Sequence, residues 1–219
     1  MAEDLAQACA GLAADPRRAA VIVDVDEVLA LFVQGFRAWL APHEVELRME
    51  RFGLFGNMYP RGGSTPVEGA RALALFTRFF AEGCEAMEAA PDAAVALARL
   101  AERAQVVILT AAPEEARSGR ARWLKAQGLD YPLVFSPGPK GEAVRAMAQA
   151  VRGPVAFVDD LLPNLDSAAE LAPQAARFQL VADPALRSLA PTAPDRHRRI
   201  DSWTDLARAI EAELFPAAG

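Results

Sequence analysis

The stretch AAVIVDVDEV, residues 19–28, decides the fold class of this 219-residue chain. Its first half is a continuous apolar run rich in β-branched side chains, and the run stops at Asp24. A half-exposed strand alternates apolar and polar residues, whereas a continuous apolar run is typical of a strand buried on both faces of a parallel sheet. The stretch therefore predicts a buried strand of a parallel sheet, with Asp24 and Asp26 at its carboxyl end.

Further apolar runs and helical stretches follow in alternation along the chain. The runs cover residues 105–109, 131–135, 154–158 and 177–181, and the helical stretches cover residues 91–103, 114–127, 141–151, 163–171 and 203–214. Strands that alternate with helices of this length form right-handed βαβ crossovers. The predicted fold class is α/β, with a Rossmann-like parallel sheet flanked by helices. Its reactive groups are expected at the carboxyl ends of the strands.

Residues 30–90 break this alternation, because they are far too long for one crossover connection. They contain two helical segments, 31–41 and 67–83, on either side of a glycine-rich turn region at 53–63. We interpret them as a small helical cap inserted after the first strand. The expected domains are a core of residues 1–29 and 91–219 and a cap of residues 30–90.

Composition and charge disfavour several classes of function. The chain has 53% hydrophobic and 24% charged residues and a formal net charge of -6. A net negative charge disfavours binding to nucleic-acid polymers or membrane surfaces, since both need clustered lysine and arginine. The N-terminal sequence lacks the basic and apolar regions of a secretory signal, and no apolar run approaches the length of a membrane span. We therefore expect a cytoplasmic protein that acts on a small molecule.

Two carboxylates two residues apart, Asp24 and Asp26, stand where the first strand runs into a loop. An aspartate there can attack phosphorus to give an aspartyl-phosphate, and a second can protonate the leaving oxygen and then activate water. One acid cannot easily serve both roles in the same step. Taken alone, such a pair more often caps a turn, so its interpretation depends on the rest of the chain.

Polar residues at three other places in the chain could bind a phosphoryl group or a metal beside this acid pair. Thr110 ends the second strand, and the small Ala111 after it would let an anion approach the amides of the next helix start, although a plain helix cap is the alternative. Lys140 lies in a rigid turn before a helix, where it can neutralise charge on a transferring phosphoryl group, or simply be an exposed lysine. Asp159 and Asp160 end another buried strand. They form either part of a metal site or a solvated loop.

The combination of acid pairs favours the metal site. Carboxylates beside a phosphate dianion repel it and one another, so the site needs a hard cation with oxygen ligands. Mg2+ is the natural choice.

The order of these residues, an acid pair, a hydroxyl, a lysine and a second acid pair, resembles the four signature motifs of the haloacid dehalogenase superfamily. The resemblance covers residues 20–182, interrupted by the expected cap. It implies a phosphatase with a core sheet of strand order 5-4-1-2-3 and a cap that closes over the site. By this resemblance, Asp24 is the phospho-acceptor and a metal ligand, and Asp26 is the acid/base and binds the metal through its backbone carbonyl. Thr110 and Lys140 bind the phosphoryl group. Asp159 and Asp160 bind the metal, and which of the two is the direct ligand stays open.

Two features depart from or extend this pattern. Glu27 stands where the superfamily often has glycine, which is expected to change the loop beside the site. Asn164 and Asp166 follow the second acid pair, where helix capping is the ordinary role and orientation of the acids is the alternative. In the cap, the candidates for binding a polar leaving group are Arg51, Asn57, Tyr59 and Arg61, with loop solvation as the alternative.

The predicted function is Mg2+-dependent hydrolysis of a small phosphorylated metabolite through an aspartyl-phosphate. A dehalogenase of the same superfamily would direct Asp24 at carbon and would need no acid two positions on, so Asp26 argues for phosphoryl chemistry. A phosphomutase uses the same acids, and residues 121–124 faintly resemble deoxyribonucleotidase-like 5′-nucleotidases. A non-catalytic protein that binds a phosphorylated ligand would be expected to lack Asp24, Asp26 or Lys140, and all are present.

Overall fold

Parallel strands form one sheet in the order β5-β4-β1-β6-β7-β8. The structure is a computed structural model that describes residues 2–15, 17 and 19–216. The strands are β1 (Ala20–Val23), β4 (Gln105–Thr110), β5 (Leu133–Phe135), β6 (Val155–Asp159), β7 (Ala176–Gln179) and the two-residue β8 (Arg198–Arg199). If the five longer strands are numbered 1 to 5 along the chain and the sheet is followed from β7 to β5, their order is 5-4-1-2-3. The predicted strand order is therefore confirmed. The short β8 adds an edge strand that was not predicted.

Successive residues of β1 face opposite sides of the sheet, and both sides are buried. Val21 and Val23 belong to one apolar cluster, and Ala20 and Ile22 belong to another. This two-sided burial follows from the period of two along a strand and explains the continuous apolar run in the sequence. The predicted α/β class is confirmed.

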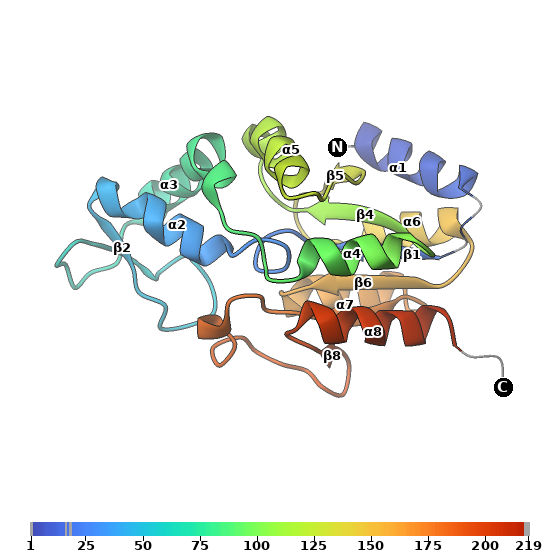
Figure 1. Cartoon of the computed structure of the whole chain (residues 1–219). Helices are drawn as coiled ribbons and strands as arrows, with labels where there is room; N and C mark the ends of the chain where they lie inside the picture. Colours follow the sequence, from blue (N-terminus) through green and yellow to red (C-terminus); the bar gives the residue numbers. More distant parts are fainter. Residues whose placement is uncertain (1, 16, 18, 217–219) are drawn as a thin grey trace.

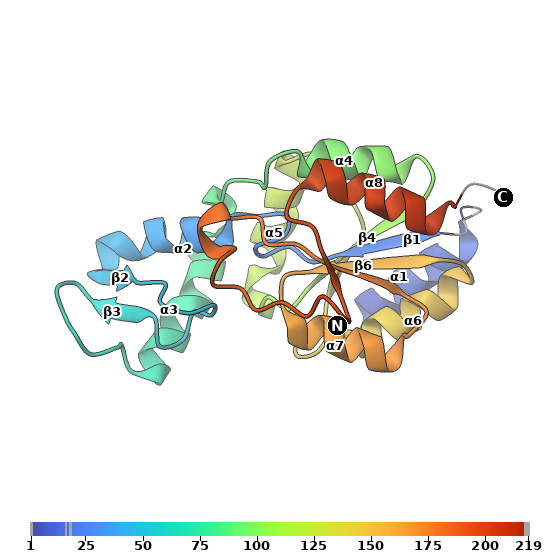
Figure 2. The same ribbon diagram turned by 90° about the horizontal axis from the view of Figure 1, so that it is seen from below.

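Helices cover both faces of the sheet. In Figure 2, α4 (Ala93–Ala101) and α8 (Trp203–Leu214) lie on one face, and α1 (Ala2–Ala14), α6 (Gly141–Val151) and α7 (Leu162–Leu171) lie on the other. The remaining core helix, α5 (Arg117–Ala126), begins after a 3-10 turn at Glu114–Ala116, so the helix predicted at 114–127 is shorter than expected. Within the described ranges, no helix is long and apolar enough to cross a membrane.

The segment between β1 and α4 lies beyond the carboxyl end of the sheet, at the left of Figure 1. It contains α2 (Phe32–Leu40) and α3 (Gly69–Glu82), close to the two predicted helical segments. It also contains an antiparallel pair, β2 (Val45–Leu47) and β3 (Met58–Pro60). The two predicted helices are therefore present, and the turn region between them also forms a short hairpin that was not predicted. Three-residue strands carry too little periodicity to be recognised, and pairing with each other is what stabilises them.

The chain passes between the core and this insertion at two adjacent points. The amide of Leu31 donates to the carbonyl of Glu88 at 2.9 Å, and the amide of Ala90 donates to the carbonyl of Leu29 at 2.8 Å. Phe36 and Phe79, on α2 and α3, are fully buried and belong to the same apolar cluster as Val21 of β1. The insertion thus packs continuously with the core through its helices.

Candidate active site

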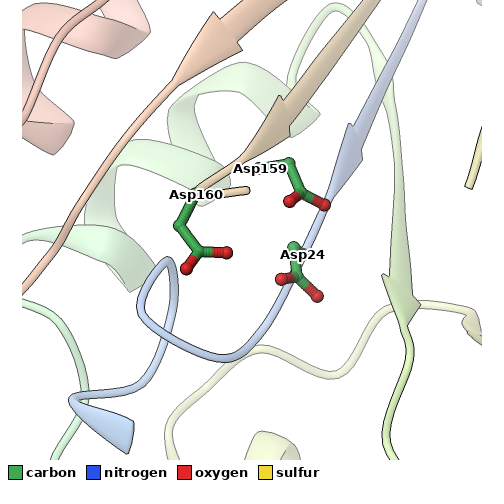
Figure 3. Close-up of side chains that lie close together, drawn as sticks. All are labelled: Asp24, Asp159 and Asp160. Atoms are coloured by element: carbon green, nitrogen blue, oxygen red, sulfur yellow. The ribbon is translucent and has the colours of Figure 1, made fainter. Parts of the chain in front are cut away.

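Three carboxylates converge at the carboxyl ends of β1 and β6 (Figure 3). The two strands are parallel neighbours with Val23 opposite Val158, so the residues that follow, Asp24 and Asp159, lie side by side. One oxygen each from Asp24, Asp159 and Asp160 lies within 4.8 Å of the others, and all three side chains are buried. The sequence expectation that these acids meet at one edge of the sheet is correct.

Lys140 bridges two of these acids. Its Nζ is 2.6 Å from Oδ1 of Asp24 and 2.8 Å from Oδ2 of Asp159, and its side chain is fully buried. The residue stands directly before α6, where the helix dipole disfavours a positive charge, and burial disfavours the charge further. Two carboxylate partners compensate for both effects, so this lysine is not the exposed turn residue that the alternative assumed.

A close approach of two helices fixes the position of Lys140. The next residue, Gly141, donates its amide to Oγ of Ser167 on α7 at 3.2 Å. A Cβ on Gly141 would lie 2.3 Å from the carbonyl oxygen of Ser167, so only glycine fits here. The contact seats the start of α6 against α7 and thereby holds the lysine beneath the strand ends.

The electrostatics of the cluster favour an added cation. Burial, together with the charges of Asp159 and Asp26, raises the pKa of Asp24 to about 7 although Lys140 opposes the shift. Burial and the charges of Asp159 and Asp24 raise the pKa of Asp160 well above its ordinary value. Burial lowers the pKa of Lys140, but the same acids outweigh it and raise that pKa above its ordinary value. Three carboxylates against one ammonium leave the cluster short of positive charge.

The donor set fits a hard divalent cation. All three donors are carboxylate oxygens, the ligand type that Mg2+ and Ca2+ take, and there is no histidine or cysteine among them. A cation among these oxygens would remove the cause of the raised pKa values by supplying the missing positive charge.

Asp159 and Asp160 have different surroundings. Oδ1 of Asp159 accepts from the amide of Leu161 at 2.9 Å and from Nδ2 of Asn164 at 2.9 Å, while its other oxygen meets Lys140. Asp160 instead lines the open cavity above the strand ends. Asn164 therefore orients Asp159, which is the alternative that the sequence analysis ranked below helix capping, whereas Asp166 pairs with Arg196 and His197 instead. The inward direction of the Asn164 side chain, which the sequence does not reveal, decides between the two roles.

Asp26 also lines the cavity and is held by an arginine that sequence reasoning missed. Nη2 of Arg120, on α5, lies 2.7 Å from Oδ1 and 3.0 Å from Oδ2 of Asp26. The Arg120 side chain is fully buried, and its Nε and Nη1 have no hydrogen-bond partner among the described residues. A signal existed in the sequence: Arg120 falls in the buried stripe of α5 with Trp123 and Leu124, three and four residues further on.

The loop after β4 is built around Thr110. Its side chain is fully buried, and its Oγ1 accepts from the amide of Ala112 at 3.2 Å. Ala111 and Ala112 line the cavity, whereas Thr110 does not. The hydroxyl thus shapes the turn that presents these two small residues to the cavity, and binding of a phosphoryl group by Thr110 stays a prediction.

The cap residues Arg51, Asn57 and Arg61 do not line the cavity in the described structure. Nδ2 of Asn57 donates to the carbonyls of Arg51 and Gly53 at 2.8 and 2.6 Å, and the Arg51 guanidinium donates to the carbonyl of Phe55 at 3.1 Å. Arg61 pairs with Glu44 at 3.0 Å. The structure does not bring these side chains to the site, because loop carbonyls without strand or helix partners take up the donors.

Glu27 anchors the loop beside the site. Its φ is 57°, a left-handed value that favours glycine, which gives a physical reason for the glycine expected there. The carboxylate is buried and accepts from the amides of Val33 at 2.7 Å and Asp183 at 3.3 Å. Burial raises the pKa of Glu27 to about 7. The residue ties the loop after β1 to the first turn of α2.

A cavity of about 270 Å³ lies above the acids. Its floor is formed by core residues that include Asp24, Asp26, Lys140 and Asp160, and its walls come largely from the insertion. The site is therefore enclosed by two parts of the chain that are distant in sequence.

Solved structures show where this fold has been seen before. A haloacid dehalogenase-like hydrolase from Streptococcus pneumoniae is 11% identical with a TM-score of 0.57, and the match covers 87% of this chain and 97% of that one. CbbY from Rhodobacter sphaeroides, in complex with phosphate, is 16% identical with a TM-score of 0.50 over 85% and 95% of the two chains. An L-2-haloacid dehalogenase is 12% identical with a TM-score of 0.56 over 87% and 98%.

No protein-family model and no curated protein sequence matches the chain. At identities this low, the structural likeness establishes the fold and leaves the reaction to the residues of the site. The resemblance predicted from the motifs is confirmed at the level of the fold: the chain has the architecture of the haloacid dehalogenase superfamily hydrolases.

Proposed function

We propose that this protein is a Mg2+-dependent phosphatase that hydrolyses small phosphomonoesters through an aspartyl-phosphate on Asp24. The observation that carries the proposal is the placement of Asp24 beside both Lys140 and the acid pair at 159–160, with Asp26 facing the same cavity. Phosphoryl transfer needs a nucleophile, a positive charge beside it, a metal site and a separate acid. Here the positive charge is the ammonium group of Lys140.

In the first step, a carboxylate oxygen of Asp24 attacks phosphorus, and the bond from phosphorus to the leaving oxygen breaks. Asp26 donates its proton to that oxygen, so the product leaves as a neutral alcohol. In the second step Asp26 takes a proton from water, the water oxygen attacks phosphorus, and the bond to Asp24 breaks to release inorganic phosphate. Lys140 holds the Asp24 carboxylate in place throughout.

Asp24 and Asp160 line the cavity and would hold Mg2+, while Asp159 fixes Lys140 from behind. When bound, the cation supplies positive charge that keeps both carboxylates ionised and offsets the charge of the phosphoryl group. The predicted contact of the Asp26 backbone carbonyl with the metal belongs to the same proposal.

Arg120 is proposed to position Asp26. Its Nη2 alone donates to both carboxylate oxygens, which fixes the direction of the Asp26 side chain beside the cavity. The insertion at 30–90 is proposed to act as the cap, since it supplies most of the cavity wall.

Dehalogenation is the competing reaction, because one of the similar structures is a dehalogenase. Attack of Asp24 on carbon would expel a halide, which needs no proton, so it gives Asp26 and its arginine no role. These two residues favour phosphoryl chemistry.

The test is release of inorganic phosphate from a broad phosphomonoester panel with MgCl2 or with EDTA, beside halide release from 2-haloacids. We expect phosphate release that needs Mg2+ and falls on the order of 10³-fold or more in Asp24→Asn. The matched control is Asp195→Asn, the same change at an exposed aspartate, which should keep full activity. Absence of phosphate release across the panel, or an active Asp24→Asn protein, would show that the proposal is wrong.

A further inference from the structure

The cavity above Asp24 is walled by phenylalanine rings. Phe32 begins α2, Phe52 and Phe55 lie in the loop between β2 and β3, and Phe76 and Phe80 lie on α3. All five line a space of about 270 Å³. No described residue of the insertion that lines this space has a polar side chain; the others are Val33, Met49, Gly53 and Leu54.

Four of these five rings, all except that of Phe52, contact one another in one connected set. Phe32 stacks on Phe80 with centroids 5.6 Å apart, and Phe76 meets Phe80 edge to face at 4.9 Å. Phe55 approaches Phe76 at 5.9 Å, yet 49% of its surface is exposed. Aromatic rings at these separations present both faces and edges to a neighbour. A further ring in the cavity would meet partners of the same kind and cover the exposed side of Phe55.

Polar side chains are confined to the floor of the cavity. They are Asp24, Asp26, Glu27, Lys140, Asp160 and Asn164, all from the core. These groups face the phosphoryl and cation positions of the proposed reaction. A sugar or another polyhydroxylated leaving group would exchange its hydrogen bonds with water for contacts with phenylalanine, and unreplaced hydrogen bonds are costly.

From this division we infer that the preferred substrates are phosphomonoesters whose leaving group is small, uncharged and aromatic. The inference rests on the proposed phosphatase function for the phosphoryl half of the substrate. It rests on the phenylalanine wall for the other half. The cavity lies just below the range of about 300–1,000 Å³ typical of drug-sized ligands, so it fits a single ring rather than a nucleotide.

The test separates binding from catalysis. Binding of 2-phenylethylphosphonate and 2-aminoethylphosphonate to the whole protein with Mg2+ is measured by calorimetry. Both carry a phosphorus–carbon bond that the proposed reaction does not cleave, and they differ only in the group at the far end. We expect the phenyl compound to bind at least tenfold more tightly.

Two variants locate the preference. Phe55→Ala removes an exposed ring from the wall and should weaken binding of the phenyl compound about fivefold or more. Leu73→Ala is the matched control, since Leu73 is 54% exposed on α3 and does not line the cavity. It should bind the phenyl compound as the wild type does.

The binding ratio decides this inference, and hydrolysis decides the proposed function. Equal binding, tighter binding of the amine, no binding of either compound, or equal effects of the two variants would overturn the inference. Hydrolysis of 2-phenylethyl and 2-aminoethyl phosphate is measured beside it. If the phenyl preference is found without any phosphate release, the pocket assignment stands and the phosphatase proposal fails.

Discussion

Replacement of Asp160 by asparagine takes one negative charge out of the buried cluster and keeps the shape of the side chain. Asp160 is 6% exposed and lies within reach of the carboxylates of Asp24 and Asp159. In the protein without metal, this carboxylate is repelled by two others and attracted by Lys140 alone. We therefore expect Asp160→Asn to be more stable than the wild type in EDTA.

The size of the gain follows from the geometry. Two like charges 4.8 Å apart repel by about 3.5 kcal/mol at an effective dielectric constant of about 20. Two such repulsions less one attraction of similar size leave about 3.5 kcal/mol. The wild type relieves part of this by binding a proton, because burial and the neighbouring acids raise the pKa of Asp160. We expect a gain of about 2 kcal/mol at about pH 8.

The pH dependence has a definite sign. A raised pKa means that the folded state favours the protonated carboxyl, so stability from this group is present at low pH and is lost as pH rises. The difference in free energy of unfolding between Asp160→Asn and the wild type should be small below about pH 4 and should grow toward about pH 8.

Urea unfolding in EDTA and in saturating MgCl2 measures both sides of the effect. The wild type should be stabilised by Mg2+, by about 2.7 kcal/mol at 100 times the dissociation constant. The variant should lose most of this increment because it lacks a ligand. Asp195→Asn, at an exposed position, is the control. Lower stability of Asp160→Asn in EDTA, or an undiminished response to Mg2+, would refute the assignment of these acids to a cation site.

Three other substitutions test neighbouring features of the site. Burial raises the pKa of Glu27 to about 7, so the free energy of unfolding of the metal-free wild type should fall by about 3 kcal/mol as the pH rises from about 4.5 to 7. Glu27→Gln should abolish this fall. Urea unfolding in EDTA across that range measures it, and identical pH profiles of the two proteins would contradict it. Arg120→Met should lower kcat about 10- to 100-fold, because its acid partner Asp26 is no longer held. Steady-state kinetics measure this, and an unchanged kcat would count against a positioning role. Gly141→Ala should cost about 1–3 kcal/mol of stability and lower kcat, because the new methyl group overlaps the carbonyl of Ser167. Gly11→Ala, where nothing lies within 4 Å, is its control and should be neutral or stabilising in the same unfolding assay.

The parallel sheet and the meeting of its strand-end acids can be predicted from the sequence alone. The run at residues 19–23 could only be buried on both faces, which requires a parallel sheet with helices on either side. Once β1 and β6 are parallel neighbours, the residues after them must lie together. Asp24 and Asp159 therefore lie together because their strands are adjacent and run in the same direction. Asp26 and Asp160 lie close to the same edge because they come one or two residues later in the chain.

The sequence determined much less about residues 30–90. Their helices are long enough for periodicity to show, but the hairpin of β2 and β3 is not. The polar residues Arg51, Asn57 and Arg61 looked like ligands because their chemistry suits one. The folded loop uses Arg51 and Asn57 to satisfy its own carbonyls instead.

The side chains that complete the site depend on contacts between elements that are distant in sequence. Periodicity shows that Arg120 faces inward, but its partner Asp26 lies 94 residues away, so only the packing of α5 brings the two together. Likewise Asn164 could cap a helix or orient Asp159, and the rotamer chosen inside the fold selects the second. The periodicity of apolar residues predicts which face of a helix or strand is buried. The residue that this face contacts depends on how elements distant in sequence pack against each other.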